Sequence, residues 1–151
     1  MGDFAGTSLA SAAAVVLVAI MSAVAAVWAM VLISEDVTQR RLPDLLTLPA
    51  AGIAVAVCCA EPRGWTGLIW PAMYVIAGPG FGGGDVKLAV SLGIMLAVTG
   101  GVGAVLAGML LASCFTVFLL LFSRQKIAPH GPSMLASAWM VGFASAFVPG
   151  V

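Results

Sequence analysis

Long apolar stretches separated by short groups of charged residues form the main pattern of this chain. The charges gather in four places: Glu35–Asp44, Glu61–Arg63, Asp85–Lys87 and Arg124–His130. The stretches between them predict six membrane helices, at about Leu9–Ile33, Leu45–Ala60, Trp65–Ala77, Leu88–Val98, Val102–Phe122 and Ser133–Val148. We therefore expect an all-α, polytopic membrane protein in which residues 1–151 form a single membrane-embedded domain.

The stretch from Leu88 to Ser123 decides the topology, because it can form one long helix or two helices broken at Thr99-Gly100-Gly101. If it crosses the membrane twice, Arg63 alone lies on one side and the other lysine and arginine residues lie opposite: Arg40, Arg41, Lys87, Arg124 and Lys126. A single crossing divides these cations evenly. Since lysine and arginine concentrate in cytoplasmic loops, six helices with both termini outside is the better interpretation. Asp36 and Asp85 then share the cytoplasmic face of the cell membrane.

Composition supports a membrane protein and excludes several functions. Of the 151 residues, 62% are hydrophobic and 8% are charged, whereas a soluble domain has roughly 25% charged residues. The net charge of zero gives no electrostatic reason to bind nucleic acid. The cysteines lie in apolar runs without a partner at metal-ligand spacing, so we expect no metal site at Cys58, Cys59 or Cys114.

The segment from Gly78 to Lys87 carries the strongest local signal, because five of its first seven residues are glycine. Glycine allows the backbone to approach another element or a bound peptide closely. Asp85 follows this run and comes directly before an apolar helix, which is also typical of a helix cap. The segment therefore has two interpretations, a flexible turn with a capping acid or a loop that presents a functional acid.

Asp36 lies at the end of the first apolar stretch. An acid at the end of a membrane helix is costly unless it faces a wet cavity, so Asp36 is a functional candidate. We expect its charged neighbours to form a solvated loop that anchors the topology: Glu35, Arg40 and Arg41. Asp44 follows Pro43 and is expected to cap the next helix.

Two carboxyl groups brought close together can share one proton, because like charges push their pKa values apart. The ionised group then takes a proton from water while the protonated group polarises a scissile carbonyl. This chemistry requires no metal ion and no cofactor. His130, the only histidine, lies close to Ser133 in sequence, but that spacing is more typical of a loop than of a catalytic dyad.

Other polar and aromatic residues are expected to have supporting roles. Lys87 lies two residues after Asp85 and is expected to steady the local charge or to reach the membrane interface. Trp65, Trp70 and Tyr74 are expected in an aromatic belt on the outer side, without a chemical role.

Two segments resemble the type IV prepilin peptidases. Asp36, six further residues and Pro43 are similar to the family's first motif, and Gly82 to Lys87 fits its G-x-G-D-x-K pattern. Ala128–Pro132 resembles, more weakly, the Pro-Phe-Gly-Pro-like segment before the family's last helix. The resemblance implies a six-helix membrane aspartic protease with Asp36 and Asp85 as the catalytic pair, and with Gly82 and Gly84 shaping the loop that holds the second acid.

The resemblance also implies a substrate. Members of the family cut the short basic leader from prepilin or pseudopilin proteins at the cytoplasmic membrane face, in pilus biogenesis or protein secretion. Larger members carry an additional domain with paired C-x-x-C motifs that is associated with methylating the new pilin N-terminus. Those cysteine pairs are not present in this sequence, so we expect cleavage without methylation.

Two alternatives were weighed against this interpretation. A non-enzymatic membrane component, such as a small transporter or an assembly subunit, would use Asp36 and Asp85 as ion ligands or as contacts between helices. A transporter often has an internal repeat, and the two halves of this sequence show none. Presenilin-like proteases share a G-x-G-D acid, but their Tyr-Asp and late Pro-Ala-Leu elements are not found here.

Overall fold

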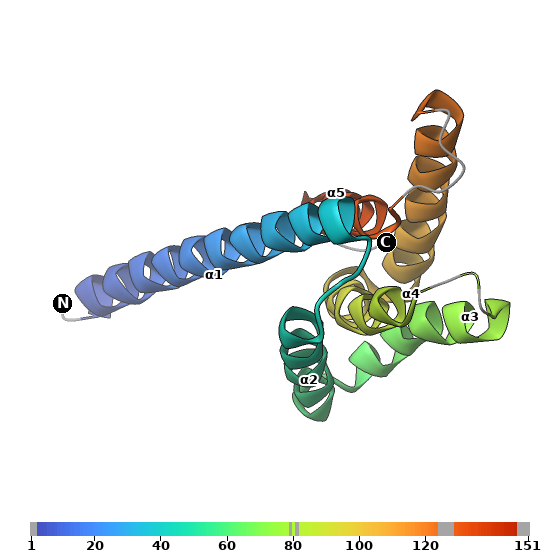
Figure 1. Cartoon of the computed structure of the whole chain (residues 1–151). Helices are drawn as coiled ribbons and strands as arrows, with labels where there is room; N and C mark the ends of the chain where they lie inside the picture. The colour runs from blue at the N-terminus through green and yellow to red at the C-terminus, as the bar shows by residue number, and fades with distance from the viewer. Residues whose placement is uncertain (1–2, 79, 81, 124–128, 148–151) are drawn as a thin grey trace. The chain divides into compact units, whose positions relative to one another are not determined.

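A computed structural model describes residues 3–78, 80, 82–123 and 129–147. The elements within these residues are all helices: α1 (Asp3–Gln39), α2 (Asp44–Ala60), the 3-10 helix η1 (Pro62–Leu68), α3 (Ile69–Ala77), α4 (Gly83–Ser123) and α5 (Gly131–Phe147) (Figure 1). The expected all-α class is thereby confirmed. Arg124, Lys126, Ala128 and the chain ends, which enter the topology and motif predictions, lie outside the described residues. The chain divides into two units, Met1–Val31 and Leu32–Val151.

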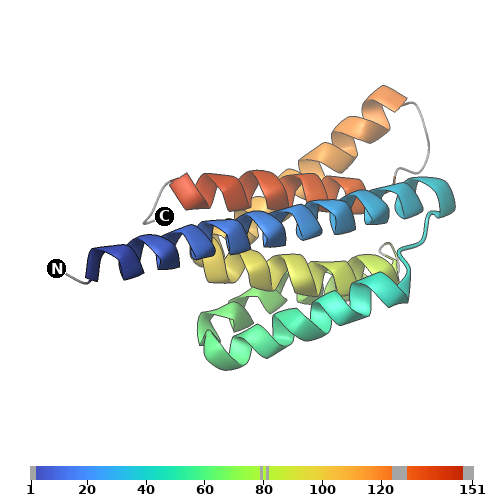
Figure 2. The ribbon, with the colours of Figure 1, turned by 90° about the vertical axis from the view of Figure 1, so that its left-hand side faces the viewer.

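Helix α4 is broken at Gly101. The φ of this residue is 70° and its ψ is −168°, a conformation that glycine adopts without the steric penalty of a side chain. The chain turns back at this point (Figure 2), so that a Cβ atom placed on Gly108 would lie 2.6 Å from Cδ1 of Leu96. The expected break at Thr99-Gly100-Gly101 is confirmed, and the two halves of α4 correspond to the two helices predicted on either side of it.

The centre of the second unit is α4, which packs against α2, η1, α3 and α5. Its closest contact is with η1. A Cβ atom on Gly67 would lie 2.3 Å from the carbonyl carbon of Gly93, and a Cβ atom on Gly93 would lie 2.2 Å from the oxygen of Gly67. The two backbones therefore touch with no side chain between them, which is typical of membrane helices that associate through small residues.

Trp70 and Tyr74 do not lie in an outer aromatic belt, so this expectation is wrong for them. Trp70 is fully buried and Tyr74 is 6% exposed, whereas Trp65 is 48% exposed. Trp70 fits against glycine on both halves of α4, because its Cβ lies 3.3 Å from the Cβ position of Gly93 and its ring is equally close to that of Gly108. Small neighbours make room for the indole inside the protein.

Two helical segments, Ser11–Gln39 and Gly83–Phe122, are long and apolar enough to cross a membrane, and α2 is a shorter apolar helix. In the second segment only 17% of the most apolar window is buried inside the protein. Large apolar side chains therefore face outward, among them Leu110, Leu121 and Phe122. A surface of this kind is unfavourable in water and is typical of a protein that lies in a membrane.

Two helix boundaries differ from the expectation. Helix α1 continues to Gln39, so Asp36 lies inside its last turns and not in a charged loop. The N–H of Arg40 still donates to the Asp36 carbonyl, at 3.0 Å, and the positive φ of Arg40, 51°, then ends the helix. Helix α4 begins at Gly83, which places Asp85 inside its first turn and not before it.

Candidate active site

Asp36 and Asp85 line the same pocket, whose volume is about 400 Å³. The end of α1, the turn that follows it and the start of α4 form the walls, through Arg40, Arg41, Leu42, Gly82, Gly83 and Gly84. The fold thus brings together two acids that are far apart in sequence, as the topology prediction requires.

Asp36 is almost fully buried, with 6% of its surface exposed. Its Oδ2 atom accepts a hydrogen bond from the backbone N–H of Gly131, at 2.9 Å. Gly131 begins α5, and the first amides of a helix have no partner within the helix and carry its positive end. A Cβ atom on Gly131 would lie 2.7 Å from the same carboxylate oxygen, so glycine is the residue that permits this contact.

Asp85 has a different setting. Its Oδ2 atom accepts a hydrogen bond from the N–H of Gly82, at 3.3 Å, so the carboxyl group reaches back over the start of α4. The capping interpretation therefore describes one contact of Asp85, and the residue lines the pocket at the same time. The Asp36 carboxylate thus accepts a hydrogen bond from the start of α5, whereas the Asp85 carboxylate accepts one from the loop directly before α4.

Gly84 allows the start of α4 to approach the turn after α1. A Cβ atom on Gly84 would lie 2.8 Å from the Cβ of Leu42, whereas one on Gly82 would have only an ordinary contact with Asp85, at 3.5 Å. Because a Cβ atom cannot rotate away, a side chain at residue 84 must move the backbone. Of the two glycines expected to shape the loop, only Gly84 lies where a side chain would not fit.

Gly84→Ala is accordingly expected to lower peptidase activity, by about tenfold or more, because overpacking of this size costs about 1–3 kcal/mol and falls on the wall of the pocket. Gly83→Ala is the matched control, since nothing lies within 4 Å of its Cβ position. Initial rates of substrate cleavage by the two variants, at equal amounts of folded protein, check the prediction. Equal losses in both variants would contradict it.

Pro43 and Lys87 do not line the pocket, and they lie at the starts of α2 and α4. Pro43 is the N-cap of α2, and no side chain caps this helix, so the expected capping role of Asp44 is wrong. The Asp44 carboxylate instead pairs with the ammonium group of Lys87, at 2.5 Å. This ion pair joins the starts of α2 and α4.

His130, next to Gly131, was given no function in the sequence interpretation. Its Nε2 atom lies 2.6 Å from the hydroxyl of Tyr74, and its Nδ1 atom lies 2.6 Å from the hydroxyl of Thr116. Burial lowers the pKa of His130, so its ring is neutral at neutral pH. The signal available in the sequence was the position of the only histidine, directly before the glycine that starts the last apolar segment.

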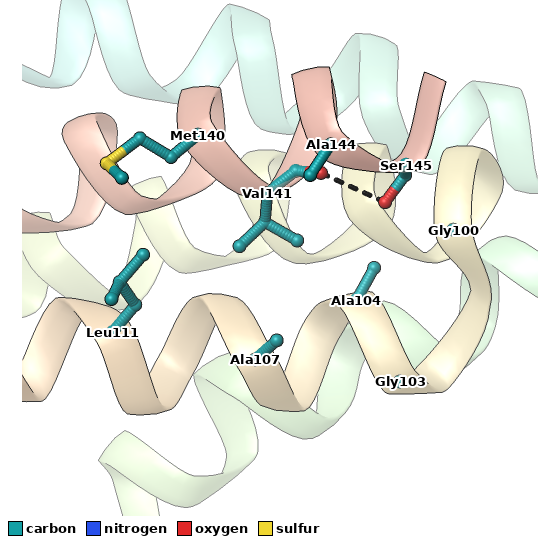
Figure 3. A pocket seen from close by; sticks show the side chains of 9 residues that line it. All are labelled: Gly100, Gly103, Ala104, Ala107, Leu111, Met140, Val141, Ala144 and Ser145. Atoms are coloured by element: carbon teal, nitrogen blue, oxygen red, sulfur yellow. Dashed lines mark hydrogen bonds between the residues drawn. The ribbon is translucent and has the colours of Figure 1, made fainter. Parts of the chain in front are cut away.

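A second cavity, of about 380 Å³, lies between the second half of α4 and α5 (Figure 3). Small and apolar side chains line it, from Gly100 to Leu111 on α4 and from Met140 to Ser145 on α5. The hydroxyl of Ser145 donates to the carbonyl of Val141 on its own helix, at 2.9 Å. The lining of this cavity contains no titratable side chain, in contrast to the pocket of the two acids.

Comparison with known proteins gives one match. No curated protein and no solved structure matches the chain. A model of the type IV leader peptidase family matches residues 23–121, which is more than half of the chain and includes both acids and both motifs that surround them. The chain belongs to the type IV leader peptidase family.

Proposed function

We propose that this chain is an aspartic endopeptidase that cleaves the leader peptide of prepilin-like proteins at the cytoplasmic membrane face, with Asp36 and Asp85 as the catalytic pair. The observation that carries the proposal is the shared pocket of the two acids, which come from the end of one helix and the start of another. Family membership supports a peptidase. The shared pocket of two acids supports the aspartic type of peptidase.

The reaction needs one ionised and one protonated carboxyl group. The ionised group takes a proton from a water molecule, whose oxygen attacks the carbonyl carbon of the scissile peptide bond. The protonated group donates its proton to the carbonyl oxygen, which gives a neutral tetrahedral diol. When the diol collapses, one of its hydroxyl groups returns a proton to the second carboxyl group as the new carbonyl forms, and the C–N bond breaks. The leaving amine takes a proton from the first carboxyl group, so the pair again has one ionised and one protonated member.

The arrangement of the helices supports a substrate that lies in the membrane. Asp36 and Asp85 lie at the ends of the two segments that are long enough to cross a bilayer. The pocket is therefore expected near the membrane surface. A peptide bond just outside the membrane, next to an apolar helix of the substrate, would reach it there. The break of α4 at Gly101 supports six crossings, and the distribution of lysine and arginine in the sequence supports the cytoplasmic side for both acids.

The proposal is tested with the chain reconstituted in lipid vesicles and a prepilin that carries a basic leader before its apolar helix. We expect a single cut at the leader junction, identified by the masses of the two products. The variant with both Asp36→Asn and Asp85→Asn should not cut. Glu35→Gln is the matched control, because Glu35 is the neighbouring acid and does not line the pocket, and it should cut at the wild-type rate.

Two outcomes would overturn the proposal. If the wild-type protein leaves prepilins intact while it is folded, leader peptides are not its substrates. If the variant without both acids still cuts, another group performs the chemistry.

A further inference from the structure

Four hydrogen bonds fix the segment that enters α5. The carbonyl of His130 accepts the N–H of Met134, at 3.1 Å, and so makes the first backbone hydrogen bond of the helix. The ring of His130 contacts Tyr74 of α3 and Thr116 of the second half of α4. The next residue, Gly131, donates its N–H to Asp36. One side chain therefore anchors the start of α5 on two helices, one residue away from a contact with a catalytic acid.

One tautomer of the neutral ring satisfies all of these hydrogen bonds at once. The hydroxyl of Thr116 donates its single hydrogen to the carbonyl of Ala112, at 3.0 Å, so at the ring it accepts from Nδ1–H. The neutral ring then has an unprotonated Nε2, which accepts the hydrogen of the Tyr74 hydroxyl. Each ring nitrogen therefore has a different role, one as a donor and one as an acceptor.

The surroundings of Tyr74 connect this ring with the second acid as well. Tyr74 contacts the His130 ring, with ring centroids 5.5 Å apart, and packs edge-on against the buried Trp70. It is also close enough to Asp85 to interact with its charge. Because Tyr74 and Trp70 are buried, the anchor of His130 lies inside the protein and not on a free surface.

We propose that His130 is a positioning residue for catalysis, which holds the Gly131 amide on the Asp36 carboxyl group through its two hydrogen bonds to Tyr74 and Thr116. This inference rests on the proposed function. The amide fixes the orientation of the Asp36 carboxyl group, and catalysis depends on that orientation because small misplacements of a reacting group cost rate. The ring itself does not contact the substrate.

His130→Phe tests the proposal, because phenylalanine keeps a ring of similar size and removes both hydrogen bonds. We expect kcat to fall about tenfold, the size of losing one hydrogen bond to a charged group, while KM for the prepilin stays unchanged. His130→Gln keeps a polar group near the Nε2 position and should recover part of kcat. A loss that appears in KM, or a glutamine variant no better than phenylalanine, would overturn the proposal.

The partners of the ring provide variants with smaller changes. Tyr74→Phe and Thr116→Val each remove one hydroxyl, and each should lower kcat less than His130→Phe does. Thr99→Val is the matched control, because Thr99 also lies on α4 and its hydroxyl donates to carbonyls of its own helix, those of Met95 and Leu96, at 3.0 and 3.3 Å. Activity that is lowered equally by Thr99→Val and Thr116→Val would overturn the proposal.

A double-variant cycle separates positioning through Gly131 from general weakening of the fold. Gly131→Ala displaces the amide, since its Cβ would lie 2.7 Å from the Asp36 carboxylate. If His130 acts through this amide, His130→Phe should cause no further loss of kcat in the Gly131→Ala protein. Losses that multiply would overturn the inference. A wild-type protein that does not cleave prepilins would instead remove the proposed function, so the two failures are distinguishable.

Discussion

Asp36→Asn and Asp85→Asn should each lower kcat for leader cleavage by about 10³-fold or more, because residues that act as one catalytic unit fail together. Asparagine keeps the size of the side chain and an oxygen that accepts the hydrogen bond from Gly131 or from Gly82. It cannot take a proton from water or donate one to the carbonyl oxygen. The substitutions therefore remove the chemistry and leave the geometry of the pocket.

The measurement is single-turnover cleavage of a prepilin in lipid vesicles, with the thermal unfolding midpoint of each variant as the control for folding. The double variant should be no slower than either single variant, since the second acid has no function without the first. A single variant that retains more than a tenth of the wild-type rate would show that its acid does not belong to the catalytic pair. Losses that multiply in the double variant would show two independent roles.

Gly67→Ala should prevent the second unit from folding correctly. The new methyl group would lie 2.3 Å from the carbonyl carbon of Gly93, which is main chain and cannot rotate away. To make room, η1 must separate from α4, and the destabilisation is expected to reach about 3 kcal/mol or more, at or above the upper end of overpacking effects. Gly93→Ala should have an effect of similar size, because its Cβ meets the oxygen of Gly67 at 2.2 Å.

Gly52→Ala is the control for this prediction. Gly52 lies in α2, and nothing lies within 4 Å of its Cβ position, so alanine should stabilise the helix by about 0.5–1 kcal/mol. Thermal unfolding in mild detergent, followed by tryptophan fluorescence, distinguishes the variants because Trp70 packs beside Gly93. A Gly67→Ala protein that unfolds at the wild-type temperature would show that the two backbones are not in contact.

The loss of activity in these two groups of variants has different causes. The asparagine variants should remain folded and inactive, whereas Gly67→Ala should be inactive because the pocket is not assembled. The start of α4, which presents Asp85, depends on the packing of that helix against η1 and α2. Activity per folded molecule therefore separates chemistry from assembly.

The hydropathy pattern predicted the helical segments, the all-α class and the break near Gly101. These predictions were correct because apolar length and glycine pairs have direct consequences for backbone structure. Two predicted membrane helices separate Asp36 from Asp85, which returns both acids to the same membrane face. This count and the two motifs predicted that the acids share one site, and both line the same pocket.

Helix ends were less predictable. Charged residues at Glu35 to Gln39 suggested a loop, but they are compatible with a helix and α1 continues through them. Asp44 had the position of a helix cap, and its carboxylate instead pairs with Lys87, which is far away in sequence. A local pattern describes which structures a segment can form, and a distant partner selects among them.

The sequence by itself thus determined the helices and their order, and it singled out the two acids that line one pocket. Only the tertiary structure decided which faces of those helices pack inside the protein, because lipid and protein interior are both apolar and hydropathy cannot distinguish them. For this reason Trp70 and Tyr74 were expected at a membrane interface and are buried. The contacts of His130 with Tyr74 and Thr116, and of Gly131 with Asp36, join residues from four helices or their ends, and such contacts exist only after those helices have packed.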